Sequence, residues 1–513
     1  MGHCVQRLGI VVCLVVPLPL VAQLPPLGVP GGIVRLELDG SLSTFEQRFR
    51  AGQLEGYGAD LSSTALGSDR IPLLADVEAR IGRIIGSTGY RINLGGLVTD
   101  AHADVGTGSL GLSLGLTGGI TLFGRIPLVS SRVQSAYSLD PSSADAGLNP
   151  GEETQLPFFA ELDAAVATLS ARLAAGDYNG NQAQLALAQS TLTDATTLRG
   201  DLFALLADPA TASPAVPTET SAAGTAIDAR IVALQTTLST GLGVSGFSLT
   251  PNLPTSVLTE AEYIQMVTDP AGPIALRLDE STVTFRGDAE VGAALTLIDR
   301  WDRSPGRGGV RVALAGLVRL PTGSRDRTDR PLDIGTGDAQ TDVQVDLVAD
   351  VGAGPIGARL SGTYVRQLEK TFPFRVTAPS QPFVGPDRLR FVRLEPGDVI
   401  ALGIHPFFRL ARTLALQAGL DHWSRGTDAY SYSSPADAIP GIDANVLAED
   451  SKVSATALAV GITYANPGGL RRGGRGLPVD ASWRYERILG SSGGRVPDAH
   501  VIRGQLRVYF GVW

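Results

Sequence analysis

Side chains able to carry out covalent chemistry are few in this sequence and lie far apart. Beyond the first residues, the histidines are His102, His405, His422 and His500, and each stands on a separate segment. Ser113 and Ser492 stand in G-x-S-x-G runs, but neither run leads from a strand into a helix as a nucleophile elbow does, and no histidines have the H-E-x-x-H spacing of a zinc protease. We therefore expect no catalytic residues, no metal site and no cofactor; a membrane-embedded hydrolase is the enzymatic alternative.

The two cysteines lie in an apolar segment at the start of the chain. Arg7 precedes the apolar stretch Leu8–Val21, which contains two prolines and is followed by the small residue Ala22. This pattern predicts a secretory signal peptide over residues 1–23. A membrane anchor is the weaker alternative, because a spanning helix needs about 20 apolar residues. Cleavage would remove Cys4 and Cys13, and with them all thiol chemistry.

Charged residues recur at every second position over long stretches. In the last segment, Ile502 and Leu506 alternate with Arg503 and Arg507. Successive side chains of a strand face opposite sides, so such a strand is apolar on one face and polar on the other. An apolar outside and a polar inside are typical of strands in a membrane barrel.

About twelve segments show this alternation. The first runs from Ile33 to about Phe49, a hairpin follows over 110–128, and the pattern is nearly continuous beyond residue 280. Gly118 and Gly119 supply the positive φ angles that a tight hairpin favours. We predict an all-β transmembrane barrel of about 12 antiparallel strands, with 14 as the upper count.

A soluble β-sandwich or lipocalin-like barrel would also alternate, but two features disfavour it. The apolar face consists mainly of Val, Leu, Ala and Gly, which would underfill a wide soluble core. The connections also alternate in length, as in outer-membrane barrels. The short ones are about 118–119, 301–308, 352–355, 410–412 and 466–476, and the long ones about 50–108, 135–280, 324–339, 371–396 and 426–450. With both ends periplasmic, every long connection is extracellular.

Seventeen charged residues fall on the inward phase and are the candidate lumen-lining residues. They are Arg35, Glu37, Asp39, Arg286, Asp288, Glu290, Arg311, Arg319, Asp346, Asp350, Arg359, Asp421, Asp480, Arg484, Glu486, Arg503 and Arg507. They form either a mutually neutralising network that holds the wall in shape or a polar lining that selects solutes. Closing the barrel would place Arg503 and Arg507 near Glu37 and Asp39.

One long connection has a helical period. Leucines at helical spacing predict helices near 162–173 and 198–205, with a third near 227–238, and Thr259 with Glu262 forms a capping box. A segment this long is more than a plain loop. We therefore divide the chain into a signal peptide (1–23), first barrel strands with a partly helical loop (24–134, its helix near 71–85), a mainly helical extracellular insertion acting as cap or plug (135–280), and the main barrel strands (281–513).

Several motifs resemble a known class of outer-membrane barrels. They are the run from Val318 to Gly323, the run from Gly335 to Asp342, and the hairpin from Gly115 to Pro127. The chain resembles the transporters associated with aromatic (meta-pathway phenol) degradation, and more distantly the long-chain fatty-acid transporter barrels. The likeness covers mainly 106–134 and 281–513 and implies transport without naming a substrate.

We predict a bacterial outer-membrane barrel that lets small, hydrophobic or amphipathic molecules pass. The alternative is a structural or surface-interaction barrel whose helical insertion binds a partner. The expected partners are outer-membrane lipid, a small-molecule solute and the barrel-assembly machinery, which would recognise the C-terminal strand; the net charge of −9 argues against nucleic acid. Trp513 falls on the polar phase of its strand, so a bulge near Gly511 or a place in the interfacial aromatic belt is expected for it.

Overall fold

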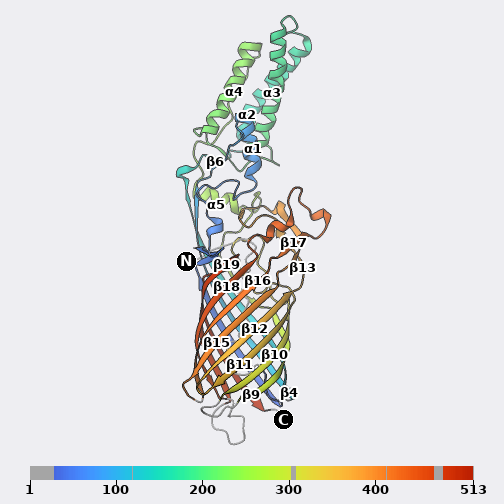
Figure 1. The fold of residues 1–513 in the computed structure, drawn as a ribbon. Coiled ribbons are helices and arrows are strands. Elements are labelled where there is room, and N and C mark those ends of the chain that lie inside the picture. Colours follow the sequence, from blue (N-terminus) through green and yellow to red (C-terminus); the bar gives the residue numbers. More distant parts are fainter. Residues whose placement is uncertain (1–27, 118, 302–307, 412, 467–477, 512–513) are drawn as a thin grey trace.

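Twelve antiparallel strands form a closed barrel in the computed structural model (Figure 1), which describes residues 28–117, 119–301, 308–411, 413–466 and 478–511. They are β1 (Ile33–Phe45), β4 (Gly96–Thr117), β5 (Ile120–Asp140), β9 (Ala289–Trp301), β10 (Gly309–Leu320), β11 (Asp342–Ala353), β12 (Ile356–Gln367), β15 (Val399–Arg409), β16 (Leu414–Arg425), β18 (Val453–Ala465), β19 (Val479–Gly493) and β21 (His500–Gly511). Each strand pairs with the barrel strands before and after it in the chain, and β1 also pairs with β21. The predicted barrel fold and the count of twelve are confirmed.

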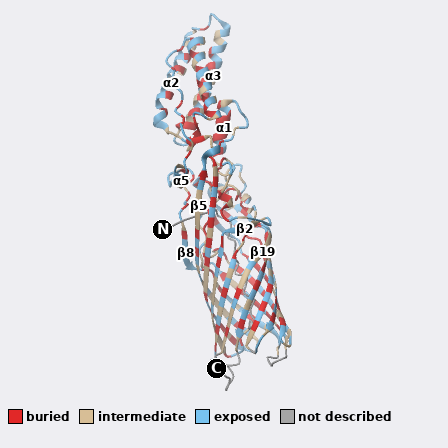
Figure 2. Ribbon diagram, turned by 90° about the vertical axis from the view of Figure 1, so that its left-hand side faces the viewer, coloured by how far each residue is buried: buried red, intermediate tan, exposed pale blue. Residues whose placement is uncertain are grey.

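The outward face of this barrel is apolar. Leu112, Leu347 and Leu402 are 55%, 49% and 59% exposed, whereas the adjacent inward residues Ser113 and Asp346 are buried. Buried and exposed positions therefore alternate along the strands (Figure 2). Exposed leucines in register on neighbouring strands form the apolar surface that lipid requires of a spanning barrel. Among the described helices, none is long and apolar enough to cross a membrane.

The long connections all lie at one end of the barrel, called here the loop end, and the short ones at the other, the turn end (Figure 1). In the first long connection, β1 ends at Phe45 rather than at the predicted Phe49. The next residues form β2 (Gln47–Arg50), which pairs with β3 (Gln53–Gly56) and β20 (Arg495–Pro497) in a separate sheet. A short η1 (Ala59–Leu61) and α1 (Leu74–Ile85) follow, the latter where a helix is predicted.

The helical insertion extends beyond the loop end (Figure 1). Its elements are η2 (Pro141–Ser143), β6 (Ala146–Leu148), α2 (Glu152–Ala175), α3 (Gln182–Leu206), β7 (Ala215–Pro217), α4 (Ala222–Thr236), the π-helical η3 (Thr237–Gly241), α5 (Glu260–Thr268) and then β8 (Ser281–Arg286). α2 ends at Gly176, whose φ of +82° suits glycine, and α5 starts with the predicted capping box. The sequence predicts a helix from residue 198, but α3 already begins at Gln182, sixteen residues earlier, after the N-cap Asn181.

β4 and β5 are longer than the sequence predicts, and their extra residues lie toward the loop end. There the polarity is reversed: Asp100 and Asp104 face outward, whereas Ala101 and Ala103 face inward and are buried. Beyond the apolar band, the outward side chains of a strand face water instead of lipid, so they are polar. The alternation of apolar outward and polar inward residues is therefore inverted there and does not predict these parts of β4 and β5.

Three further strands form a small sheet at the loop end. They are β13 (Lys370–Arg375), β14 (Leu389–Glu395) and β17 (Ala429–Tyr432), accompanied by η4 (Pro386–Arg388), η5 (Pro435–Asp437) and η6 (Ala444–Ala448). Phe374, Val392, Tyr430 and Leu447 form its apolar core. The predicted signal peptide, residues 118, 302–307, 412 and 467–477 of the predicted short connections, and Trp513 lie outside the described residues.

Candidate functional site: the ion-paired interior of the barrel

The inward side chains of the strands bring most of the predicted charged residues together inside the barrel. Four of them, Glu37, Asp39, Asp421 and Glu486, are half-buried. Twelve are buried: Arg35, Asp288, Glu290, Arg311, Arg319, Asp346, Asp350, Arg359, Asp480, Arg484, Arg503 and Arg507. Charges buried to this extent need partners, and the pairs form four groups around the wall.

The first group lies at the seam between β1 and β21. Arg507 donates from Nε to Glu37 Oε2 at 2.7 Å, and Arg35 Nε lies 3.1 Å from the same oxygen. The strand register sets Glu37 directly opposite Arg507. The sequence also predicts Arg503 near Asp39; Arg503 stands opposite Ser41, the next inward residue of β1 after Asp39, and its ion pair is with Glu486 at 3.3 Å.

The second group joins β5, β9, β10 and β11. Glu290 accepts from Arg125 Nη2 at 2.7 Å and from Arg319 Nε at 3.3 Å. Arg319 also donates to Asp342 at 2.6 Å. On β11 and β12, Asp346 accepts from Thr363 Oγ1 at 2.7 Å. Two guanidinium groups thus alternate with two carboxylates across four strands.

The third group lies nearer the turn end, on β10, β11 and β12. Arg359 binds Asp350 through two parallel hydrogen bonds of 2.5 and 2.8 Å, the bidentate geometry of a strong charge-assisted pair. Arg311 Nη1 lies 3.6 Å from Asp350, and Arg311 Nε lies 3.7 Å from Asp299. The guanidinium of Arg311 also stacks 5.3 Å from the Trp301 ring.

The fourth group contains the one buried histidine among the described residues. His405 Nε2 lies 2.9 Å from Asp421 Oδ1, and Asp421 also accepts from Arg484. Arg484 Nε contacts Glu486 at 2.6 Å. Gly419 makes room for the imidazole, because a Cβ there would lie 2.1 Å from His405 Nδ1.

Two chain segments reach inward residues of the wall near its ends. At the turn end, Val29 is 2% exposed, and its N–H donates to Thr121 Oγ1 at 2.7 Å. At the loop end, Ser131 Oγ donates to the backbone carbonyl of Ile334, which belongs to the β10–β11 loop (residues 321–341), at 2.6 Å. Asp288 also holds this loop, accepting from the backbone N–H of Gly323 at 2.7 Å.

One of the seventeen predicted lumen-lining residues, Arg286, does not face the interior, and that prediction is wrong. In β8 it stands opposite Leu128, whose side chain is 61% exposed on the outer face, and Arg286 is exposed as well. Glu290 in β9, by contrast, stands opposite the inward Arg125. The register changes by one residue between β8 and β9, at Gly287–Asp288, and a one-residue shift exchanges the two faces of a strand. Sequence alternation alone does not locate such a break.

The sequence analysis missed four residues that complete these groups. Arg125 and Asp342 bind Glu290 and Arg319, His405 binds Asp421, and Tyr509 donates to Asp480. Asp342 and Tyr509 share the inward phase of Asp346 and Arg507, four and two residues away, which was the available signal. Arg125 has no charged residue two or four positions away, and His405 has only Arg409, so the alternation gave little indication of either.

The arrangement carries no recognisable catalytic geometry. The four described histidines contact separate partners, and no group of three or more His, Cys, Asp or Glu among the described residues could hold a metal ion. The inward side chains fill the interior of this twelve-stranded barrel with paired charges.

No protein-family model and no curated protein matches this chain. The COG4313 outer membrane channel from Pseudomonas putida F1 aligns with 95% of this chain and 100% of its own, at 10% identity and a TM-score of 0.42. A Pseudomonas aeruginosa FadL homologue aligns with 94% and 90%, at 7% identity and 0.28. The TodX deltaS2S3 mutant monoaromatic hydrocarbon channel aligns with 94% and 91%, at 9% identity and 0.26. Likenesses this weak say nothing about the solute; the fold follows from the closed strand register.

Proposed function

We propose that this protein is a bacterial outer-membrane channel with a narrow interior, which lets small amphipathic or hydrophobic molecules pass and excludes bulk water flow. One observation carries this proposal: the inward charges are buried against one another. In a wide aqueous pore the lining charges would be solvated. Here Asp350 and Arg359 are only 3% and 4% exposed.

The ends of the barrel support the same function. Val29 at the turn end and the β10–β11 loop at the loop end both hydrogen-bond to inward wall residues. A solute would pass by local movement of these segments and not through a standing water column. Outer-membrane lipid would surround the apolar band, and the barrel-assembly machinery would recognise the C-terminal strand.

The test compares the wild type with a variant whose interior is loosened. Arg125→Ala with Glu290→Ala removes both members of one pair and leaves Arg319 bound to Asp342. Removing both partners avoids a buried unpaired charge, so the barrel should still fold. The matched control is Arg366→Ala with Glu395→Ala, an exposed pair of the same charges.

We expect small single-channel conductance from the wild type in planar bilayers, a severalfold increase in the interior variant and no change in the control. Proteoliposomes of the wild type should take up short aliphatic or aromatic carboxylates faster than sugars of similar size. A wild type that conducts like a wide porin would contradict the proposal. So would the absence of both conductance and uptake from the wild type and the interior variant.

A further inference from the structure

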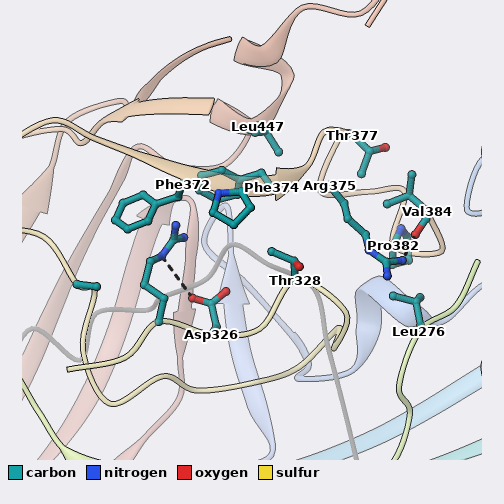
Figure 3. Close-up of a pocket in the computed structure, with 13 residues that line it drawn as sticks. Leu276, Asp326, Thr328, Phe372, Phe374, Arg375, Thr377, Pro382, Val384 and Leu447 are labelled. Carbon is teal, nitrogen blue, oxygen red and sulfur yellow. Dashed lines mark hydrogen bonds and ion pairs between the residues drawn. The ribbon is translucent and has the colours of Figure 1, made fainter. Parts of the chain in front are cut away.

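A small apolar cavity lies at the loop end, between β13 and the β10–β11 loop (Figure 3). Its volume is about 220 Å³, and the side chains of Phe372, Phe374, Leu276, Val384 and Leu447 supply most of its wall. All five are buried. A dry cavity of about 150 Å³ is enough to hold benzene. This cavity therefore accommodates one ring-sized apolar group with a small substituent.

A guanidinium group with open hydrogen-bond donors lines the same cavity. The Arg325 guanidinium carbon lies 4.2 Å from the centre of the Phe372 ring and 4.6 Å from that of Phe374. Its nearest ionic neighbour among the described residues is Asp326, with Nε 3.9 Å from Oδ1, which is too long for a hydrogen bond. The two rings hold the guanidinium by cation–π contact without using its N–H groups.

The charged residues that line the cavity are two arginines and one aspartate, Arg325, Arg375 and Asp326. Arg375 donates three hydrogen bonds of 2.6 to 2.9 Å to the backbone carbonyl oxygens of Ile274, Ala275 and Val384. Two guanidinium groups and one carboxylate in the lining favour a ligand with a single negative charge. Arg325, which is not tied to the backbone in this way, is the guanidinium placed to bind it.

We propose that this cavity binds a monocarboxylate with one compact apolar group, of the size of benzoate. The carboxylate would accept hydrogen bonds from Arg325, whose planar fork matches two carboxylate oxygens. The apolar group would fill the space between the phenylalanine rings and the aliphatic wall. The site lies outside the ion-paired interior, so ligand binding does not depend on whether the barrel conducts.

The test is calorimetric titration of the full chain in detergent micelles with benzoate and with its neutral analogue benzamide. We expect saturable binding of benzoate and at least tenfold weaker binding of benzamide. Arg325→Gln should weaken benzoate binding at least tenfold. The matched control is Arg327→Gln, which removes the same charge two residues away, from an exposed pair with Asp329; it should change affinity less than twofold.

A second variant guards against a loop that misfolds when Arg325 is lost. Thr328 also lines the cavity, and Thr328→Phe adds a ring to that space while keeping Arg325. It should abolish benzoate binding in a protein whose barrel still shows its folded mobility on unheated gels. Benzoate binding that survives both Arg325→Gln and Thr328→Phe, or equals that of benzamide, would overturn the proposal, as would the absence of saturable benzoate binding to the wild type.

Discussion

The carboxyl of Asp338 in the β10–β11 loop has a raised pKa. Burial, and then the negative charge of Asp342, raise the pKa of Asp338 to about 6. Asp338 accepts from Gln367 Nε2 and from the backbone N–H of Gln340, both at 2.8 Å, whereas Asp342 accepts from the Arg319 guanidinium at 2.6 Å. The neutral donors at Asp338 compensate a buried negative charge less well than a guanidinium does.

The sign of the resulting pH dependence follows from linkage. Between about pH 4 and pH 6 the folded protein keeps the Asp338 proton that the unfolded chain releases, so this group's contribution to the free energy of unfolding falls as pH rises. Asp338→Asn removes that effect, and rotation of the Gln367 amide can preserve its hydrogen bond. The variant should match the wild type near pH 4 and be more stable by an amount on the order of 3 kcal/mol near pH 7.

The measurement is the temperature at which the folded barrel loses its fast gel mobility, read for both proteins from pH 4 to pH 7. Asp329→Asn is the control: burial raises the pKa of Asp329, but the hydrogen bonds from Arg327 outweigh this and lower it. That variant should lose stability relative to the wild type as pH rises. A gap between Asp338→Asn and the wild type that stays constant with pH would show that Asp338 does not titrate in this window.

At the scale of elements, two arginines at the seam between β1 and β21 share one carboxylate. Glu37 lies between Arg507 and Arg35, at 2.7 and 3.1 Å. Glu37→Gln would leave two buried guanidinium groups side by side, and breaking a buried pair in this way costs about 3 to 5 kcal/mol.

The comparison for Glu37→Gln is Glu395→Gln, in which the lost carboxylate belongs to an exposed pair with Arg366. Exposed pairs contribute at most about 1 kcal/mol. Urea unfolding of the two variants in lipid vesicles should therefore separate them clearly. Equal losses of stability would mean that the seam is held by its backbone ladder alone.

Elements differ in how far the sequence predicts them. The two-residue period locates twelve strands because lipid and a polar interior impose opposite demands on alternate residues. It fails where that contrast ends: in the outer parts of β4 and β5, where Asp100 and Asp104 face water, and at Gly287, where one extra residue turns Arg286 outward. The cavity beside Phe372 arises from contacts between segments distant in the chain, which no local pattern encodes.

At the scale of the whole molecule, the helical insertion joins the chain at a base formed by β6 and β7, and it also contacts α1, where Arg83 binds Asp201 at 2.6 Å. β6 pairs with β7, and the Leu258 N–H donates to the Ala146 carbonyl at 3.1 Å. The chain therefore leaves and re-enters this base at neighbouring points, so residues 148–257 can be replaced by a short glycine linker.

The shortened protein should keep the barrel, because no barrel strand pairs with a removed residue. We expect its circular dichroism to lose most of the helical signal, because α1 and α5 remain, and its gel-mobility transition to shift by only a few degrees. A barrel that no longer forms would show that the insertion is needed for folding. Unchanged permeability together with lost binding to cells would favour the surface-interaction alternative over a channel cap.

The pairing of β1 with β21 also has a consequence for the order of events in biogenesis. The first barrel strand finds its second partner only in the last residues of the chain, where Thr44 meets His500 and Ile33 meets Gly511. An unpaired strand edge in lipid leaves backbone groups without hydrogen bonds. The ring therefore cannot be completed in the membrane until β21 has been translated and exported. A premature stop before residue 500 thus removes the entire inserted protein and not only its last strand.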